Sequence, residues 1–196
     1  MKSKSKILLV SILLMFSGVL WAQDTIRNSP QSDNRSEEIV DKEKQQKIIN
    51  DAEETKTVIS QKLPEASRLF ETSAGYAIFP NVGKGAYILG GAAGNGVVYE
   101  NGELVGFAEL RQLDIGIQLG GQAYRQVMFF KTPGALNSFK NGNFEFGANA
   151  SAVIVDDGRA ESINFQDDVA VITMPKAGAM LEISVAGQKF NYGKID

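Results

Sequence analysis

The sequence predicts an α+β fold in which N-terminal amphipathic helices pack on a strongly twisted antiparallel β-sheet, open or partly closed. Residues 36–63 contain neither Gly nor Pro and carry apolar residues at helical spacing. Beyond Ser73, short runs of β-branched and aromatic residues alternate with turn signals. No regular succession of strand, helix and strand occurs, so the strands are expected to pair antiparallel.

The first 22 residues have the layout of a secretory signal peptide. Three lysines between Met1 and Ile7 precede an apolar run to Leu20, and Leu20-Trp21-Ala22 resembles a small-residue cleavage site. The run is shorter than the ~20 apolar residues that a membrane-spanning helix needs. We therefore expect residues 1–22 to be removed and the protein to be exported, periplasmic or secreted and peripheral to a membrane. An uncleaved anchor is the alternative.

The composition excludes several classes of function. The 196 residues include no Cys and no His, which rules out thiol and imidazole catalysis, disulfides and His-ligated or Cys-ligated metals. The net charge is −3 and becomes −6 without the three lysines of residues 1–22, which argues against a nucleic acid partner. We expect no catalytic residue, no cofactor and no metal site, and hence no enzyme.

The helical part follows a flexible polar leader at residues 23–35. One face of the helix predicted over residues 36–63 carries Ile48, Ala52, Ile59 and Leu63, with Ile49 beside it. Asn34 or Ser36 is expected to cap its start and Pro64 to end it. A second, short helix is expected through Leu69 and Phe70, so the helical part covers residues 36–72.

Residues 73–196 are expected to be mainly β. The expected strands are Tyr76–Phe79, Gly96–Tyr99, Leu113–Leu119, Val127–Phe130, Phe144–Val155, Val169–Met174 and Leu181–Val185. Asn101-Gly102 predicts a two-residue hairpin turn, because both residues tolerate positive φ. Asn141-Gly142 and Asp157-Gly158 are weaker turn signals. Pro133–Lys140 predicts a short helix.

The sequence context does not favour nucleotide binding or glycoside hydrolysis. The glycine cluster at residues 90–96 precedes a strand rather than a helix, so it predicts sheet bends or close backbone contacts instead of a nucleotide loop. A pair of acids could cleave a glycosidic bond, but nothing in the spacing of the candidates selects that function over solvent-facing carboxylates. These candidates are Glu109, Asp114, Glu145 and Glu182.

An ordered series of motifs resembles the SYLF lipid-binding domain family. The series comprises Gly75–Gly85, Gly90-Gly91, Gly116–Tyr124, Phe129-Phe130, Phe139–Gly147 and Gly187–Phe190. The resemblance runs from about Ala52 to Tyr192 and implies one SYLF-like domain over residues 36–196. It also implies a non-enzymatic domain that binds phospholipids, in a family whose eukaryotic members bind phosphatidylinositol lipids and include actin regulators.

Headgroup choice and actin binding are not expected to carry over. The predicted helix has seven acidic and five basic side chains, whereas eukaryotic members use a basic helix. We expect a phospholipid-binding module of the bacterial cell envelope, with Lys42, Lys44, Lys47 and Lys84 contacting anionic headgroups. The alternative is a structural or protein-binding envelope component without lipid affinity.

Overall fold

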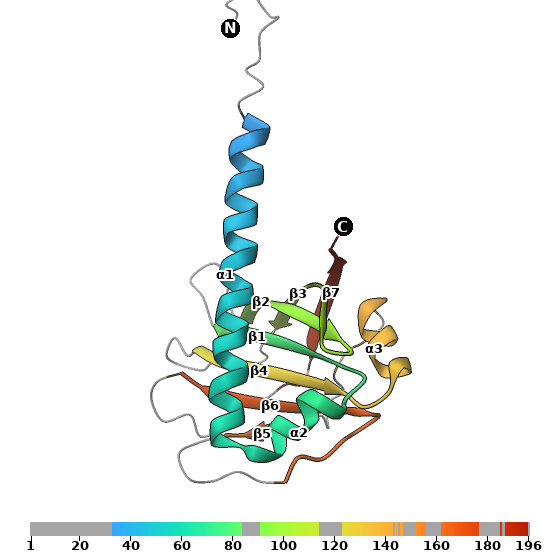
Figure 1. Ribbon diagram of the computed structural model, residues 1–196. Coiled ribbons are helices and arrows are strands. Elements are labelled where there is room, and N and C mark those ends of the chain that lie inside the picture. Colours follow the sequence, from blue (N-terminus) through green and yellow to red (C-terminus); the bar gives the residue numbers. More distant parts are fainter. Residues whose placement is uncertain are drawn as a thin grey trace, which may run out of the picture. The chain divides into compact units, whose positions relative to one another are not determined.

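A computed structural model describes residues 33–83, 91–113, 123–142, 144, 146, 152–155, 162–176, 185 and 187–195 (Figure 1). Of residues 33–40 and Leu113 only the backbone is described. The chain forms two compact units, Met1–Glu38 and Ile39–Asp196, and the second contains the sheet. The expected signal peptide and all of the expected leader before Asp33 lie outside the described residues.

The three described helices are α1 (Asp33–Lys62), α2 (Pro64–Thr72) and α3 (Pro133–Lys140). Pro64 separates α1 from α2 as expected, because it takes the first position of α2, where its missing N–H costs nothing. α1 begins at Asp33, so Asn34 and Ser36 lie inside the helix and the expectation that one of them caps it is wrong. The helix over Pro133–Lys140 is confirmed. The Thr132 hydroxyl caps it by accepting from the Ala135 N–H at 3.3 Å.

Seven strands form one open sheet in the order β5-β6-β4-β1-β2-β3-β7. The strands are β1 (Gly75–Gly83), β2 (Gly91–Glu100), β3 (Glu103–Leu113), β4 (Ala123–Phe130), β5 (Val153–Ile154), β6 (Val169–Pro175) and β7 (Gln188–Lys194). All neighbours pair antiparallel except β5 and β6, which are parallel. The α+β class is confirmed, and the sheet is not closed.

Three strand predictions need correction or lie outside the described residues. Within the described part of the expected strand Phe144–Val155, Val153–Ile154 forms β5, while Phe144 and Phe146 pack on the core outside the named strands. The backbone of Phe146 nevertheless exchanges hydrogen bonds with Gly187 and Gln188 at the start of β7. β7 was not among the expected strands, since Asn and Gly at its outward positions are rare in strands. Most of Leu113–Leu119 and of Leu181–Val185 lies outside the described residues, as do Asp157-Gly158.

The β2–β3 hairpin has the predicted turn. Asn101 and Gly102 have φ of 52° and 85° between the paired residues Glu100 and Glu103, the positive values that a type I′ turn requires. Asn141-Gly142 instead follows α3, and the N–H of Gly142 donates to the Phe139 carbonyl at 3.1 Å. The second signal therefore ends a helix rather than turning a hairpin.

Each face of the sheet is covered by different elements. On the face that we call the α1 face, Ala52, Ile59 and Phe70 of α1 and α2 pack on strand residues such as Ile78 and Val127. The predicted apolar face of α1 is thus confirmed and lies within this core. On the opposite face, which we call the α3 face, Leu136 and Phe139 of α3 pack on strand residues that include Phe79 and Phe130.

The sheet curls strongly around the α3 face. β4 and β7 are separated by three strands, yet the amide of Gln126 on β4 donates to Gln188 on β7 at 2.7 Å. In a flat sheet the four strand spacings would put these residues about 19 Å apart. The rings of Phe79 and Phe190 also approach to 5.7 Å across two intervening strands. The predicted strong twist is therefore present in an open sheet.

Two glycines of the 90–96 cluster allow close backbone approach. A Cβ on Gly96 would lie 2.4 Å from the Ile78 carbonyl, and one on Gly94 would lie 2.7 Å from the Asn81 carbonyl. Both positions are inside β2, so the described part of the cluster belongs to the sheet, as expected.

Candidate functional site

At one end of the α1 face, six residues from neighbouring strands lie side by side in a row across the sheet. Backbone pairing connects, in spatial order, Lys176, Ala123, Gly83, Ala93, Arg111 and Lys189. Their side chains share the α1 face because alternate residues of a strand point to the same side. The middle of the row is small and both of its ends are basic.

Arg111 and Lys189 lie directly opposite each other on β3 and β7. Like charges at directly opposed positions destabilise a strand pair. The Arg111 guanidinium lies 2.8 Å from the carboxylate of Glu109, its neighbour on the same face, and both side chains are largely or partly exposed. The pair places two cationic groups side by side on the α1 face, where an anion could contact both of them.

The other basic end of the row is built by β6, β1 and α1. The Lys176 ammonium donates to the Asn81 side-chain oxygen, and the Asn81 amide donates to Asp51 of α1 at 3.5 Å. Lys47, one turn earlier on α1, pairs with the same carboxylate at 2.6 Å. Asp51 thereby connects a predicted lysine to the end of the sheet.

Arg125 of β4 lies near these groups and pairs with Glu54 of α1 at 3.1 Å. Burial lowers the pKa of Lys176, the Arg125 guanidinium lowers it further, and the Asp51 carboxylate opposes these effects. The Lys176 ammonium is therefore disfavoured by its surroundings, and an added anion would relieve this.

We call these five cations the basic end of the α1 face: Lys47, Arg111, Arg125, Lys176 and Lys189. Their described carboxylate partners are Asp51, Glu54 and Glu109. The described residues thus bring five cations together at one end of the sheet in a chain whose net charge is −3.

Of the predicted lysines that the structure describes, Lys47 reaches the basic end, whereas Lys42 and Lys44 do not. Lys42, Lys44 and Lys47 are all exposed on α1, but at roughly 100° per residue Lys42 points away from Lys44. Lys44 pairs with Asp41 at 3.8 Å on the exposed surface of the helix. Lys84 lies outside the described residues, next to Gly83 of the end row. All four remain predicted headgroup contacts.

Four cations of the basic end were missed at the sequence level. Arg111, Arg125, Lys176 and Lys189 belong to, or directly follow, four different strands. Each of these residues lies near the end of its strand or directly after it. This position near a strand terminus is the only signal that the sequence offers for them. Their grouping depends on strand order and register.

The carboxylates considered for glycoside hydrolysis do not form a described pair. Glu109 is bound to Arg111, and Asp114, Glu145 and Glu182 lie outside the described residues. In the part of the chain that the structure describes, no group of three or more acidic residues could hold a metal ion.

Part of the chain matches a known protein family. The model of the Ysc84 family, described as Las17-binding protein actin regulator, matches residues 111–192. Residues 111–192 belong to the Ysc84, or SYLF, family. The match covers β3 from Arg111 through most of β7 and is shorter than the resemblance from Ala52. The comparison with curated proteins found no match.

The SYLF family is known for actin-regulating and lipid-binding roles, and it is a family of binding and regulatory domains rather than of enzymes. The matched segment contains four of the five cations of the basic end. Lys47 is the one outside it.

Proposed function

We propose that this chain is a non-enzymatic phospholipid-binding module of the bacterial cell envelope, which contacts anionic headgroups peripherally through its basic end. The observation that carries the proposal is the opposed pair Arg111 and Lys189 in the same row as Lys176. A phosphate group takes bidentate hydrogen bonds from arginine and a point charge from lysine.

The membership of residues 111–192 in a family with lipid-binding members supports this proposal. No helix of the described chain is long and apolar enough to cross a membrane. Five cations gathered at one end would help to orient a chain of net negative charge toward an anionic bilayer.

The decisive experiment is co-sedimentation of the purified chain with vesicles of phosphatidylcholine alone or mixed with phosphatidylserine. Binding should require phosphatidylserine. The double variant Arg111→Gln/Lys189→Gln should bind about 30-fold more weakly, because each basic residue near an anionic surface contributes roughly 1 kcal/mol.

The matched control is Arg68→Gln/Lys194→Gln, which removes the same charge from exposed residues of α2 and of the opposite end of β7. It should bind like the unmodified chain.

A further variant replaces Lys42, Lys44, Lys47 and Lys84 with Gln and tests the headgroup contacts predicted from the sequence. Equal losses in the control and test variants would contradict a specific role for the basic end.

The second candidate is a structural or protein-binding envelope component without lipid affinity. The net charge of −3 favours it, because such a chain is repelled by an anionic bilayer. The absence of binding to vesicles of either composition would select this candidate.

A further inference from the structure

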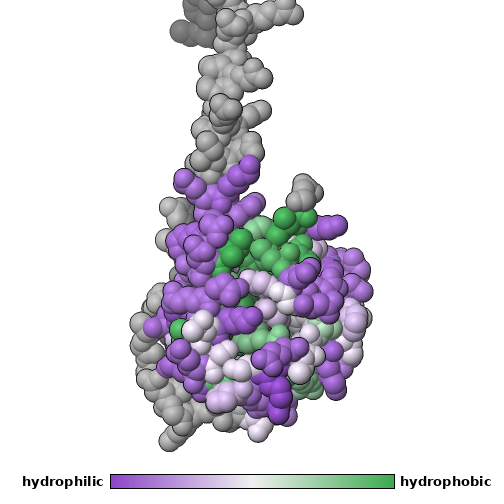
Figure 2. Space-filling model, viewed as in Figure 1, coloured by the Kyte–Doolittle hydropathy of each residue, from purple (hydrophilic) through white to green (hydrophobic). Residues whose placement is uncertain are grey.

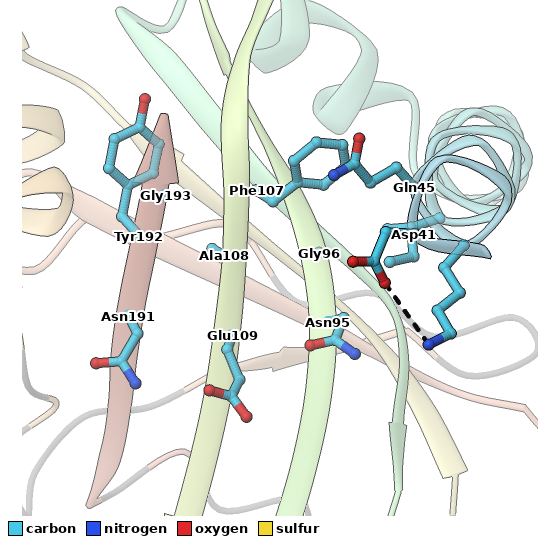
Figure 3. A pocket seen from close by; sticks show the side chains of 12 residues that line it. Asp41, Gln45, Asn95, Gly96, Phe107, Ala108, Glu109, Asn191, Tyr192 and Gly193 are labelled. Carbon is cyan, nitrogen blue, oxygen red and sulfur yellow. Dashed lines mark ion pairs between the residues drawn. The ribbon is translucent and has the colours of Figure 1, made fainter. Parts of the chain in front are cut away.

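A groove of about 400 Å³ lies beside α1, next to the basic end (Figure 3). Its floor is formed by β2, β3 and β7, and its wall by Asp41, Lys44, Gln45 and Ile48 of α1. Figure 2 shows a mainly hydrophilic surface with a hydrophobic area between α1 and the C-terminal end of the chain. The groove therefore offers both polar and apolar contacts.

The polar part of the floor is a line of side chains across three adjacent strands. Asn95, Glu109 and Asn191 are cross-strand neighbours and lie in one line in Figure 3. Asparagine is depleted in strands, so strand stability does not favour two of them in register. Within the described residues, the side-chain amides of Asn95, Asn191 and Gln45 form no hydrogen bond and are available to a ligand.

The apolar part of the floor is Phe107, a half-buried ring that faces the groove. Its cross-strand neighbour on the edge strand is Gly193, where an added Cβ would meet nothing within 4 Å. The backbone of Gly193 is not in the left-handed region, so neither packing nor conformation requires glycine there. Glycine in a strand often marks a place where another molecule approaches closely.

The charges of the groove are compensated within it or beside it. Asp41 lies 3.8 Å from the Lys44 ammonium, and Glu109 lies 2.8 Å from the Arg111 guanidinium. Among its described lining residues, the groove therefore has no excess of positive charge to attract a phosphate. A neutral ligand fits it better.

We infer that this groove binds a neutral pyranose ring of an oligosaccharide. Sugar hydroxyls both donate and accept hydrogen bonds, and the amides of Asn95, Asn191 and Gln45 offer both kinds of partner. The Glu109 carboxylate adds acceptor sites, and the C–H face of a pyranose packs on the ring of Phe107 over the space left open by Gly193. This sugar site adjoins the proposed headgroup contact and shares Lys44 and Glu109 with its surroundings, but it does not depend on lipid binding.

The test is titration of the isotope-labelled chain with a β-1,4-linked glucose tetramer and with a β-1,4-linked N-acetylglucosamine tetramer, followed by NMR. At least one tetramer should shift the backbone amide signals of Asn95, Phe107, Glu109, Asn191 and Gly193 in a saturable manner. If neither tetramer shifts these signals, the inference is overturned.

Two variants localise the binding. Gly193→Val should fill the open space, retain the fold because valine suits a strand, and abolish the shifts. Asn191→Ala should weaken binding by removing one amide. The control Gly134→Ala lies on α3, away from the groove, and should bind like the unmodified chain. Shifts that persist in both groove variants would also overturn the inference, whatever the result with lipid vesicles.

Discussion

Gln188 joins the two sides of the curled sheet from inside its core. Its side-chain nitrogen lies within hydrogen-bond distance of acceptors on Gln112, Tyr124 and Gln126 at 3.1 to 3.3 Å, and its oxygen accepts from Gln126. All four side chains are buried. Because an unpaired buried amide costs free energy, this cluster ties the position of β7 to that of β4.

We predict that Gln188→Leu lowers the free energy of unfolding by about 2 kcal/mol or more. The substitution removes the hydrogen bonds that Gln188 makes with three buried side chains. Urea denaturation measures this loss. Gln46→Leu removes an exposed hydrogen bond to Asn50 and should change the free energy of unfolding by less than about 0.5 kcal/mol. Similar effects of the two substitutions would contradict a special role for the buried cluster.

Tyr99 provides a pH-dependent contact between α1 and the sheet. Its hydroxyl donates to the Glu53 carboxylate at 2.7 Å. Burial raises the pKa of the Tyr99 phenol above its ordinary value of 10.0, and the bond to Glu53 raises it further. The folded protein therefore keeps this proton after the unfolded chain has lost it.

The stabilisation from Tyr99 should be complete below pH 10.0 and be lost as the pH rises above that value. The fall in the free energy of unfolding from this group can reach about 1.4 kcal/mol per pH unit. Tyr99→Phe should be less stable at neutral pH and show a shallower decline in alkali. Urea denaturation at a series of alkaline pH values checks this, and parallel declines in the two proteins would refute it.

At the scale of elements, the turn of the β2–β3 hairpin depends on backbone conformation rather than on packing. A Cβ on Gly102 would meet nothing within 4 Å, but φ there is 85°.

Helix α1 is held on the sheet by two kinds of contact. Ala52 and Ile59 are fully buried, while Asp51 and Glu54 make polar contacts with strand residues.

Gly102→Ala should therefore cost about 1 kcal/mol of stability through the backbone alone. Gly134→Ala replaces a glycine of α3 that lies outside the left-handed region and has room for a methyl group, so it should stabilise the protein by about 0.5–1 kcal/mol. Thermal denaturation of the two variants checks the opposite signs. A loss of stability in both would show that space or helix contacts dominate at Gly134.

At the scale of the whole molecule, a net negative chain gathers five described cations at one end of its sheet. The apolar face of α1, which could have inserted into a bilayer, is packed against the sheet at Ala52 and Ile59. Any vesicle binding through the described surface should therefore be electrostatic and should not involve insertion of α1 into the bilayer.

We predict that vesicle binding at about 0.1 M salt is lost at about 1 M, where the screening length falls from roughly 10 Å to 3 Å. Hydrogen exchange of the amides of residues 52–62 should be the same with and without vesicles, because α1 stays on the sheet. Salt-resistant binding together with faster exchange in this segment would show that α1 leaves the sheet to enter the bilayer.

Local residue order was enough to predict several features of this protein. The apolar spacing of Ile48, Ala52, Ile59 and Leu63 predicted the buried face of α1, and Pro64 predicted its end. Asn101-Gly102 and Pro133–Lys140 specify their turn and helix through backbone preferences that do not depend on distant residues. The absence of Cys and His removed whole classes of chemistry directly.

Only the tertiary structure decided which side chains meet. Arg111 and Lys189 became neighbours through the register of β3 and β7, and Gln126 met Gln188 because the sheet curls. Lys42, Lys44 and Lys47 are close in sequence, but the helical rotation separates them and only Lys47 reaches the sheet end. Sequence spacing determines periodicity within an element, whereas strand order, register and curvature arise from contacts between distant segments, and these set the basic end and the groove.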